Sequence, residues 1–154
     1  MKSKVARRTL GLAFAASLAM TVAASAQSGP CSMARAAGSY SFTDNGTVLG
    51  VGLRTAVGVF TLDAAGNITN GSATSSLNGT VAVETFSGTY TVNPDCTGSG
   101  TAKIFSSGVD ILNLTMNLSF DNGLREMRAI FTSLTAEPGN IPLQSVISLN
   151  AVKQ

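Results

Sequence analysis

The 154-residue sequence predicts an all-β fold, an eight-stranded antiparallel up-and-down β-barrel. Turn signals recur along the chain, and between them apolar and polar residues alternate with a period of two. Beyond one short helical turn, no segment sustains the 3.6-residue apolar period of a helix. Histidine and tryptophan are absent and cysteine occurs twice, which excludes Ser-His-Asp and Cys-His nucleophiles, His-based metal sites and four-cysteine zinc sites. We expect no cofactor and no metal.

The first 26 residues have the three parts of an export signal. Four cations between Lys2 and Arg8 precede an apolar stretch from Leu10 to Ala24, and small residues at 24–26 form a cleavage motif. The stretch is too short and too rich in alanine to favour spanning a bilayer. We therefore predict a signal peptide at 1–26, a single domain at 27–154, no later membrane-spanning segment, and a secreted or periplasmic location.

Removal of this segment reverses the sign of the net charge. The whole chain carries +2, but four of its ten cations lie in the signal, so residues 27–154 hold six Lys or Arg against eight Asp or Glu, a net charge of −2. The remaining cations are scattered, with no aromatic platform for stacking bases beside them. The sequence therefore indicates no nucleic-acid partner.

The two cysteines are expected to form a disulfide. In an oxidising compartment Cys31 and Cys96 would close a loop of 65 residues. The chain-entropy relation puts such a cross-link at roughly 4 kcal/mol before strain. Because the chain has no CxxC motif, we expect a structural clamp and not a redox site.

The elements follow in order from local signals. Ser32 can cap a helical turn at 33–37 that Gly38 ends. Seven turn signals then separate eight strands, and most of the connections are short enough for hairpins between antiparallel neighbours. The turn signals lie at 44–46, 63–67, 78–79, 93–95, 106–108, 121–123 and 137–140.

Alternation inside the strands predicts one buried and one solvated face. From Leu112 to Phe120 every even position is apolar, while the odd positions carry Asn, Thr or Ser. In the segment 80–92, Phe86 and Tyr90 lie on one side and hydroxyl residues on the other. Glycines at 50, 52, 58 and 88 mark bulges or tight bends, and the polar segment 68–78 could be an exposed edge hairpin or a loop.

The C-terminal run is expected to seal the sheet. Residues 143–152 alternate well enough to pair with the strand that contains Tyr40, which would leave no unpaired edge. A two-sheet β-sandwich is the alternative that the same patterning would satisfy. An outer-membrane barrel would also fit export and alternation, but the absence of Trp and the presence of only two Tyr argue against its aromatic girdles.

Two stretches resemble a known group of proteins. GVFTLDAAGNITNG at 58–71 and FSGTYTVNPDCTG at 86–98 are similar to small exported bacterial proteins described as allene-oxide-cyclase-barrel-like or lipocalin-like. The resemblance covers roughly residues 31–152 and implies a calycin-type eight-stranded barrel. Its plant relatives cyclise an unstable fatty-acid epoxide in an apolar cavity. The matching motifs are turns and strand ends, so they carry no active-site residue over to this chain.

A candidate site follows from the phase of the strands. If Phe86 and Tyr90 point inward, Glu84 does too, and the same phase places Arg54 with Phe60 and Asp110 with Leu112. Arg54 and Asp110 would then meet at one rim, with Glu84 deeper, where they could orient a polar head group or supply a general acid or base. The competing interpretation is solvated strand-end charges over a filled core. The predicted ligand-binding residues are Arg54, Phe60, Glu84, Phe86, Tyr90 and Asp110; no catalytic or metal-binding residue is assigned.

Two functions compete. The first is a secreted barrel that binds a small apolar ligand in its lumen without catalysis. The alternative is an extracellular module with a packed core, serving structure or surface interaction. A cyclase or isomerase of the allene-oxide-cyclase type is the less favoured third. Eight strands allow either a packed or a ligand-holding barrel, so an internal cavity distinguishes the first two.

Overall fold

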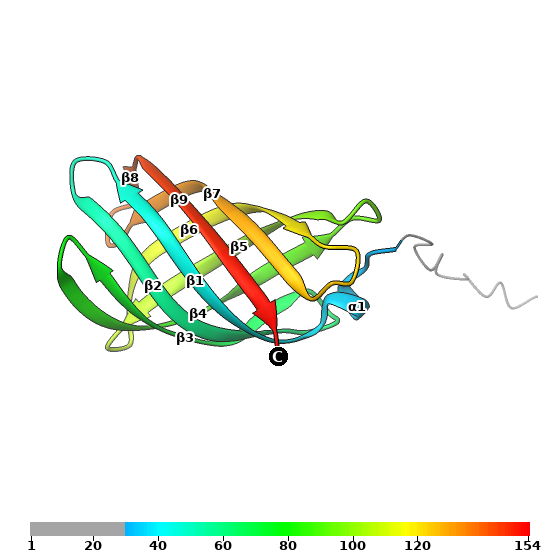
Figure 1. Ribbon diagram of the computed structural model, residues 1–154. Coiled ribbons are helices and arrows are strands. Elements are labelled where there is room, and N and C mark those ends of the chain that lie inside the picture. Colours follow the sequence, from blue (N-terminus) through cyan, green and yellow to red (C-terminus); the bar gives the residue numbers. More distant parts are fainter. Residues whose placement is uncertain (1–29) are drawn as a thin grey trace, which may run out of the picture.

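A computed structural model describes residues 30–154, and the predicted signal peptide at 1–26 lies outside them. These 125 residues form one short helix and nine strands, arranged as a barrel (Figure 1). The elements are α1 (Met33–Ala36), β1 (Gly38–Val48), β2 (Gly52–Leu62), β3 (Asn67–Leu77), β4 (Thr80–Val92), β5 (Thr97–Ser106), β6 (Val109–Phe120), β7 (Glu126–Ala136), β8 (Ile141–Leu143) and β9 (Ser145–Lys153).

Eight of the strands close into an antiparallel up-and-down barrel, as predicted. Each strand from β1 to β7 pairs with the next, β7 also pairs with β9, and β9 pairs with β1, where Tyr40 lies opposite Lys153. The three-residue strand β8 adds to one end of β7. Closure confirms the barrel over the sandwich and leaves the eight principal strands without a free edge.

One predicted turn is wrong. Residues 44–46 continue β1, and the chain turns at 49–51 instead, where Gly50 takes a left-handed φ of 79°. Asp-Asn-Gly is a strong hairpin signal in isolation, but here Asp44 points into the barrel and its carboxylate binds a side chain on β2. The other six turns lie where the sequence predicts them, and the ambiguous segment 68–78 is largely β3, an interior strand between β2 and β4.

The alternation of side chains separates an apolar interior from a hydroxyl-rich outer wall. Aromatic rings fill part of the interior: Tyr40 stacks on Phe60 with ring centroids 5.4 Å apart, and Phe42 meets Phe86 edge-on at 5.7 Å. Threonine, serine and asparagine occupy most of the outward positions of β3, β4, β5 and β6. This is the two-faced pattern predicted from the period of two.

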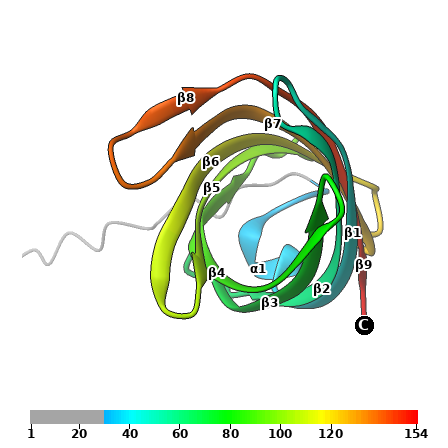
Figure 2. The ribbon, with the colours of Figure 1, turned by 90° about the vertical axis from the view of Figure 1, so that its left-hand side faces the viewer.

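The two ends of the barrel differ. The helix end carries α1 and the turns at 63–66, 93–96 and 121–125, and the Cys31–Cys96 disulfide holds α1 to the second of these turns. The hairpin end carries the turns at 49–51, 78–79, 107–108 and 137–140. Figure 2 looks along the barrel from the hairpin end, with α1 across the far end. Within residues 30–154 the one helix has four residues, too few to cross a membrane.

Candidate functional site

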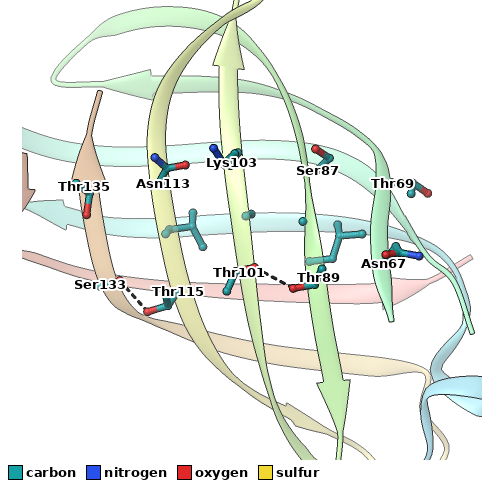
Figure 3. A pocket seen from close by; sticks show the side chains of 14 residues that line it. Asn67, Thr69, Ser87, Thr89, Thr101, Lys103, Asn113, Thr115, Ser133 and Thr135 are labelled. Atoms are coloured by element: carbon teal, nitrogen blue, oxygen red, sulfur yellow. Dashed lines mark hydrogen bonds between the residues drawn. The ribbon is translucent and has the colours of Figure 1, made fainter. Parts of the chain in front are cut away.

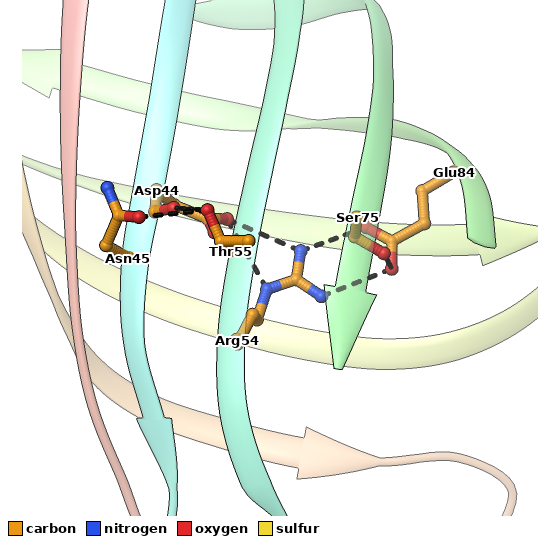
Figure 4. Close-up of polar contacts among 6 residues, drawn as sticks. All are labelled: Asp44, Asn45, Arg54, Thr55, Ser75 and Glu84. Atoms are coloured by element: carbon orange, nitrogen blue, oxygen red, sulfur yellow. Dashed lines mark hydrogen bonds and ion pairs between the residues drawn. The ribbon is translucent and has the colours of Figure 1, made fainter. Parts of the chain in front are cut away.

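A charged cluster lies inside the barrel, on the wall formed by β1, β2, β3 and β4. Arg54 Nη2 donates to Glu84 Oε2 at 2.9 Å, and Arg54 Nη1 donates to Glu84 Oε1 at 3.2 Å. Arg54 Nε and Nη2 both reach Asp44 Oδ2 at 3.4 Å. Ser75 Oγ donates to Glu84 Oε1 at 2.7 Å (Figure 4). We call these four residues, Asp44, Arg54, Ser75 and Glu84, the lumenal cluster.

The strand register brings the cluster together. Arg54 lies opposite Gly46 on β1, and Glu84 lies opposite Ala73 on β3. Neither partner has a polar side chain that could compete for the guanidinium or the carboxylate. Because inward positions recur every second residue, four adjacent strands each place one polar side chain at a similar depth.

Burial makes the cluster electrostatically unusual. The exposed fractions are 2% for Asp44, 6% for Arg54 and 4% for Glu84. Burial raises the pKa of Asp44, and the charge and hydrogen bonds of Arg54 offset only part of that rise. Burial alone would lower the pKa of Arg54, but Glu84 and Asp44 together raise it. Arg54 is therefore cationic between two carboxyl groups.

One polar atom of the cluster is left over. Asp44 Oδ1 is buried and has no hydrogen-bond partner among residues 30–154. A buried acceptor without a partner costs about 1 to 3 kcal/mol. The atom therefore marks a position where a donor from outside the chain would be stabilised.

Two small cavities lie in the lumen. The first, of about 40 Å³, borders Asp44, Arg54 and Glu84 on one side and apolar side chains of β4 to β7 and β9 on the other. The second, of about 30 Å³, lies deeper, toward the helix end, and is lined by apolar residues and Tyr90. The two cavities share four lining residues, Phe86, Ala102, Met116 and Leu149. These four side chains therefore lie between the polar cavity and the apolar one.

The structure brings five of the six predicted site residues to the lumen. Arg54, Glu84 and Phe86 line the first cavity, beside the lumenal cluster, which we call the upper cavity. Phe60, Phe86 and Tyr90 line the deeper one. The Tyr90 hydroxyl, however, donates to the backbone oxygens of Asp63 at 2.6 Å and Met33 at 3.2 Å. The ring of Tyr90 borders the cavity, while its hydroxyl links α1 to the turn at 63–66. That these residues bind a ligand stays a prediction.

Asp110 is the exception. Its side chain is expected to point into the barrel with Leu112, and this prediction is wrong. Ile104 pairs with Leu112 while Phe105 pairs with Asp110, so one extra residue, Ile111, is accommodated in β6. This bulge reverses the phase of the strand start. Asp110 consequently faces the outer wall, where its Oδ2 lies 3.5 Å from Lys103 Nζ. It does not meet Arg54.

The predicted site lacks two polar lumenal residues. The Asp-Asn-Gly signal places Asp44 in a turn, and Ser75 lies in a segment whose two faces are both polar. Met116 is predicted on the buried face of its strand, and the structure confirms that facing. The signal that could have found Asp44 is its even spacing from Tyr40 and Phe42, which places it on their face of β1.

A second hollow lies on the outside of the barrel. A groove of about 680 Å³ runs across the outer faces of β3 to β7, lined largely by hydroxyl and amide side chains (Figure 3). Thr89 and Thr101 share a hydrogen bond of 3.0 Å, and Thr115 and Ser133 one of 2.7 Å. We call this feature the outer groove. Lys103 is its one charged lining residue.

The arrangement of both hollows suits non-covalent binding. Within residues 30–154 no group of three His, Cys, Asp or Glu side chains gathers to hold a metal ion. The lumenal cluster offers a free acceptor beside an apolar cavity, which can orient one polar group of a small molecule.

Comparison with known proteins bears on the fold. The fold resembles that of EF1p2_mFAP2b bound to DFHBI. The TM-score with this solved structure is 0.52 at 15% sequence identity, and the alignment covers 80% of this chain and all of the other. At this identity the likeness shows the fold alone. No protein-family model matches the chain, and no curated protein matches its sequence.

Proposed function

We propose that this barrel is an exported protein that binds a small molecule in its lumen without catalysis. The polar end of the ligand would meet the lumenal cluster, and its apolar body would lie against Phe86 and Met116. The observation that carries the proposal is the lumenal cluster itself, a buried set of charges with a spare acceptor that faces a cavity in an otherwise apolar core.

Stability alone does not account for these charges. Replacing a buried ion pair by well-packed apolar residues is often neutral or stabilising by about 1 to 4 kcal/mol. A barrel interior filled by side chains needs no charge to fold. The cluster is therefore better explained by recognition of a polar group than by the demands of the fold.

The size of the cavities bears on the ligand. Cavities of 40 and 30 Å³ hold only a few waters, whereas pockets for drug-sized ligands measure roughly 300–1,000 Å³. Met116 is unbranched and flexible, and Phe86 is half-buried. Rotation of these two side chains, which lie between the cavities, would join the two spaces. The ligand is therefore a small molecule that moves Phe86 and Met116 aside when it binds.

The comparisons support the proposal at the level of architecture. A protein with the same overall fold is bound to DFHBI, and a barrel of eight strands is just wide enough to enclose one small ligand. The resemblance of 58–71 and 86–98 to allene-oxide-cyclase-barrel-like or lipocalin-like proteins points the same way. The Cys31–Cys96 disulfide supports a secreted or periplasmic location, since disulfides persist in oxidising compartments.

The packed-core alternative has an observation of its own. The outer groove, at about 680 Å³, is much larger than either lumenal cavity. A surface-interaction module would use that groove and leave the lumen closed. Variants of the two regions separate these functions.

Titration with a small probe, 1-butanol, followed by the NMR resonance of the Met116 methyl group, tests the proposal. We expect saturable binding by the wild type, and a several-fold weaker affinity after Phe86→Trp, which fills the lumen further, or Glu84→Gln. Lys103→Gln, on the outer groove, should leave the affinity unchanged. A correctly folded protein that binds no 1-butanol, or one whose binding responds only to Lys103→Gln, would favour the surface-interaction module.

A further inference from the structure

The lumenal cluster has an imbalance between acceptors and donors. Glu84 accepts from Arg54 through both oxygens and from Ser75 through one of them. Asp44 Oδ2 accepts from two nitrogens of Arg54. Asp44 Oδ1, by contrast, has no partner within residues 30–154 and is buried. The polar atom left free in the cluster is thus an acceptor.

The donors of the cluster are committed. All three guanidinium nitrogens of Arg54 already donate to carboxylate oxygens, and the Ser75 hydroxyl donates to Glu84. One N–H of Arg54 Nη1 remains, but an anion that accepted from it would lie beside the Glu84 carboxylate. Like charges at that separation repel strongly where water is scarce.

The rest of the cavity wall does not change this balance. The strands β5, β6, β7 and β9 contribute only uncharged side chains to the upper cavity, namely Ala102, Ile104, Leu114, Met116, Phe131 and Leu149. Two carboxyl groups therefore face the cavity with one guanidinium. With both carboxyl groups ionised, the net charge around the cavity is −1.

We propose that the lumen selects ligands whose polar end donates hydrogen bonds, alkylammonium ions above all and alcohols next, over carboxylates such as fatty acids. This inference rests on the proposed function and names its ligand class. An ammonium group can donate to Asp44 Oδ1 and neutralise the excess charge. An alcohol can donate without changing the charge. A carboxylate has no proton to donate to Asp44 Oδ1, and the excess negative charge around the cavity repels it.

Three probes with the same tail and different polar ends test the selectivity: butylammonium, 1-butanol and butyrate. Binding is followed by NMR of the protein labelled with ¹³C at its methionine methyl groups. Residues 30–154 contain three methionines, and Met116 borders both cavities while Met33 lies in α1. Lumenal binding shifts the Met116 methyl resonance and gives a Kd for each probe. We expect butylammonium to bind at least tenfold more tightly than butyrate, with 1-butanol between them.

Two variants locate the preference. Asp44→Asn keeps the shape of the side chain and removes its charge, so it should weaken butylammonium about tenfold while 1-butanol changes less than twofold. Glu126→Gln removes one negative charge from the exposed surface and should change neither. Equal affinities for butylammonium and butyrate, or an Asp44→Asn protein that binds butylammonium as the wild type does, would overturn the selectivity while leaving lumenal binding intact. If none of the probes moves Met116, the proposed function fails and this inference fails with it.

Discussion

The helix end and the lumenal cluster treat their polar groups in opposite ways. At the helix end, buried hydroxyls and turn carboxylates meet backbone partners: Tyr40 donates to the carbonyl of Ala36 at 2.8 Å, and Asp121 accepts from the N–H groups of Arg125 and Glu126. Near the hairpin end, the lumenal cluster leaves Asp44 Oδ1 without a partner within residues 30–154. Local hydrogen bonds complete the helix end, and the lumenal cluster offers an acceptor to a molecule from outside.

The pKa directions express the same contrast. Three turn carboxylates at the helix end have lowered pKa values because nearby N–H and O–H groups donate to them; they belong to Asp63, Asp95 and Asp121. Asp44 has a raised pKa, because burial outweighs the favourable effect of Arg54. The turn carboxylates are stabilised in their charged form by folding, and Asp44 is not. The turn carboxylates of the helix end therefore add to the free energy of unfolding, whereas the buried charge of Asp44 lowers it.

The exposed apolar side chains are also unevenly placed. Of the twelve large aliphatic residues that are exposed within 30–154, eight lie in the hairpin-end turns or the strand ends beside them: Leu49, Val51, Leu53, Val81, Val83, Val109, Ile141 and Val146. The helix end has charged turns and the clamped helix instead. An apolar molecule would therefore meet the hairpin end first on its way to the lumenal cluster.

The largest expected loss of stability is at the helix end. Replacing Cys31 and Cys96 together by Ser should lower the free energy of unfolding by about 4 kcal/mol, because a 65-residue loop is no longer closed in the unfolded chain. Urea unfolding measures the change. Binding of 1-butanol by the folded fraction should persist, since neither cysteine belongs to the lumenal cluster. Two free thiols in the unreduced, denatured wild type would contradict the disulfide.

Removal of the one cation in the lumenal cluster comes next. Arg54→Met leaves two buried carboxyl groups without their partner and should cost about 3 kcal/mol at pH 7. The loss should shrink as the pH falls, because burial raises the pKa of Asp44 and its protonation removes one of the two charges. Urea unfolding at pH 7 and at a lower pH checks both.

A triple variant separates charge from packing. Combining Arg54→Met with Asp44→Leu and Glu84→Met should restore most of the stability, because apolar groups replace the whole cluster. It should also abolish the preference for butylammonium. A triple variant as unstable as Arg54→Met alone would mean that the cluster is needed for the fold, against its proposed role in recognition.

A smaller effect is expected from one hydroxyl at the helix end. Tyr40→Phe removes the donor to Ala36 and Leu124 and should cost about 1 to 2 kcal/mol, since buried carbonyls lose a partner. Thermal unfolding measures it, with Thr89→Val on the outer wall as a control of similar hydroxyl loss. A Tyr40→Phe protein with wild-type stability would remove the contrast between the two ends.

The smallest expected effect is a change in how the free energy of unfolding of the protein depends on pH, and it belongs to Asp44. Because its folded-state pKa is raised, its contribution to stability is present below the unfolded pKa and is lost as the pH rises through the folded pKa. Asp44→Asn should therefore gain stability relative to the wild type as the pH rises from 3 to 7. Asp121→Asn should lose stability over the same range, because the lowered pKa of Asp121 gives the opposite dependence. Urea midpoints at four pH values test the two signs, and parallel slopes would contradict the account.

Most of the barrel could be predicted from local signals, because hairpin turns and a period of two are short-range properties. The pairing of the C-terminal run with the Tyr40 strand followed from the need to leave no free edge, and it is confirmed. The turn at 44–46 was wrong because a long-range partner, Arg54, satisfies the carboxylate that would otherwise bind its own turn.

The site was only partly predictable, for reasons of register. Arg54, Glu84 and Phe86 share the lumen because their strands keep phase, whereas one extra residue at Ile111 turns Asp110 outward. The sequence of β6 contains no glycine that would mark this one-residue bulge. Nor does it show how much of the interior the side chains fill, since the size of the two cavities depends on the packing of all eight strands.

The most direct test of lumenal binding is an NMR measurement of contacts between protons of bound 1-butanol and protons of the protein. Binding in the lumen should give nuclear Overhauser effects to the Met116 methyl group and the Phe86 ring, which border both cavities. Effects only to Thr89 and Thr101 in the outer groove would contradict it and would show that this protein binds on its outer wall.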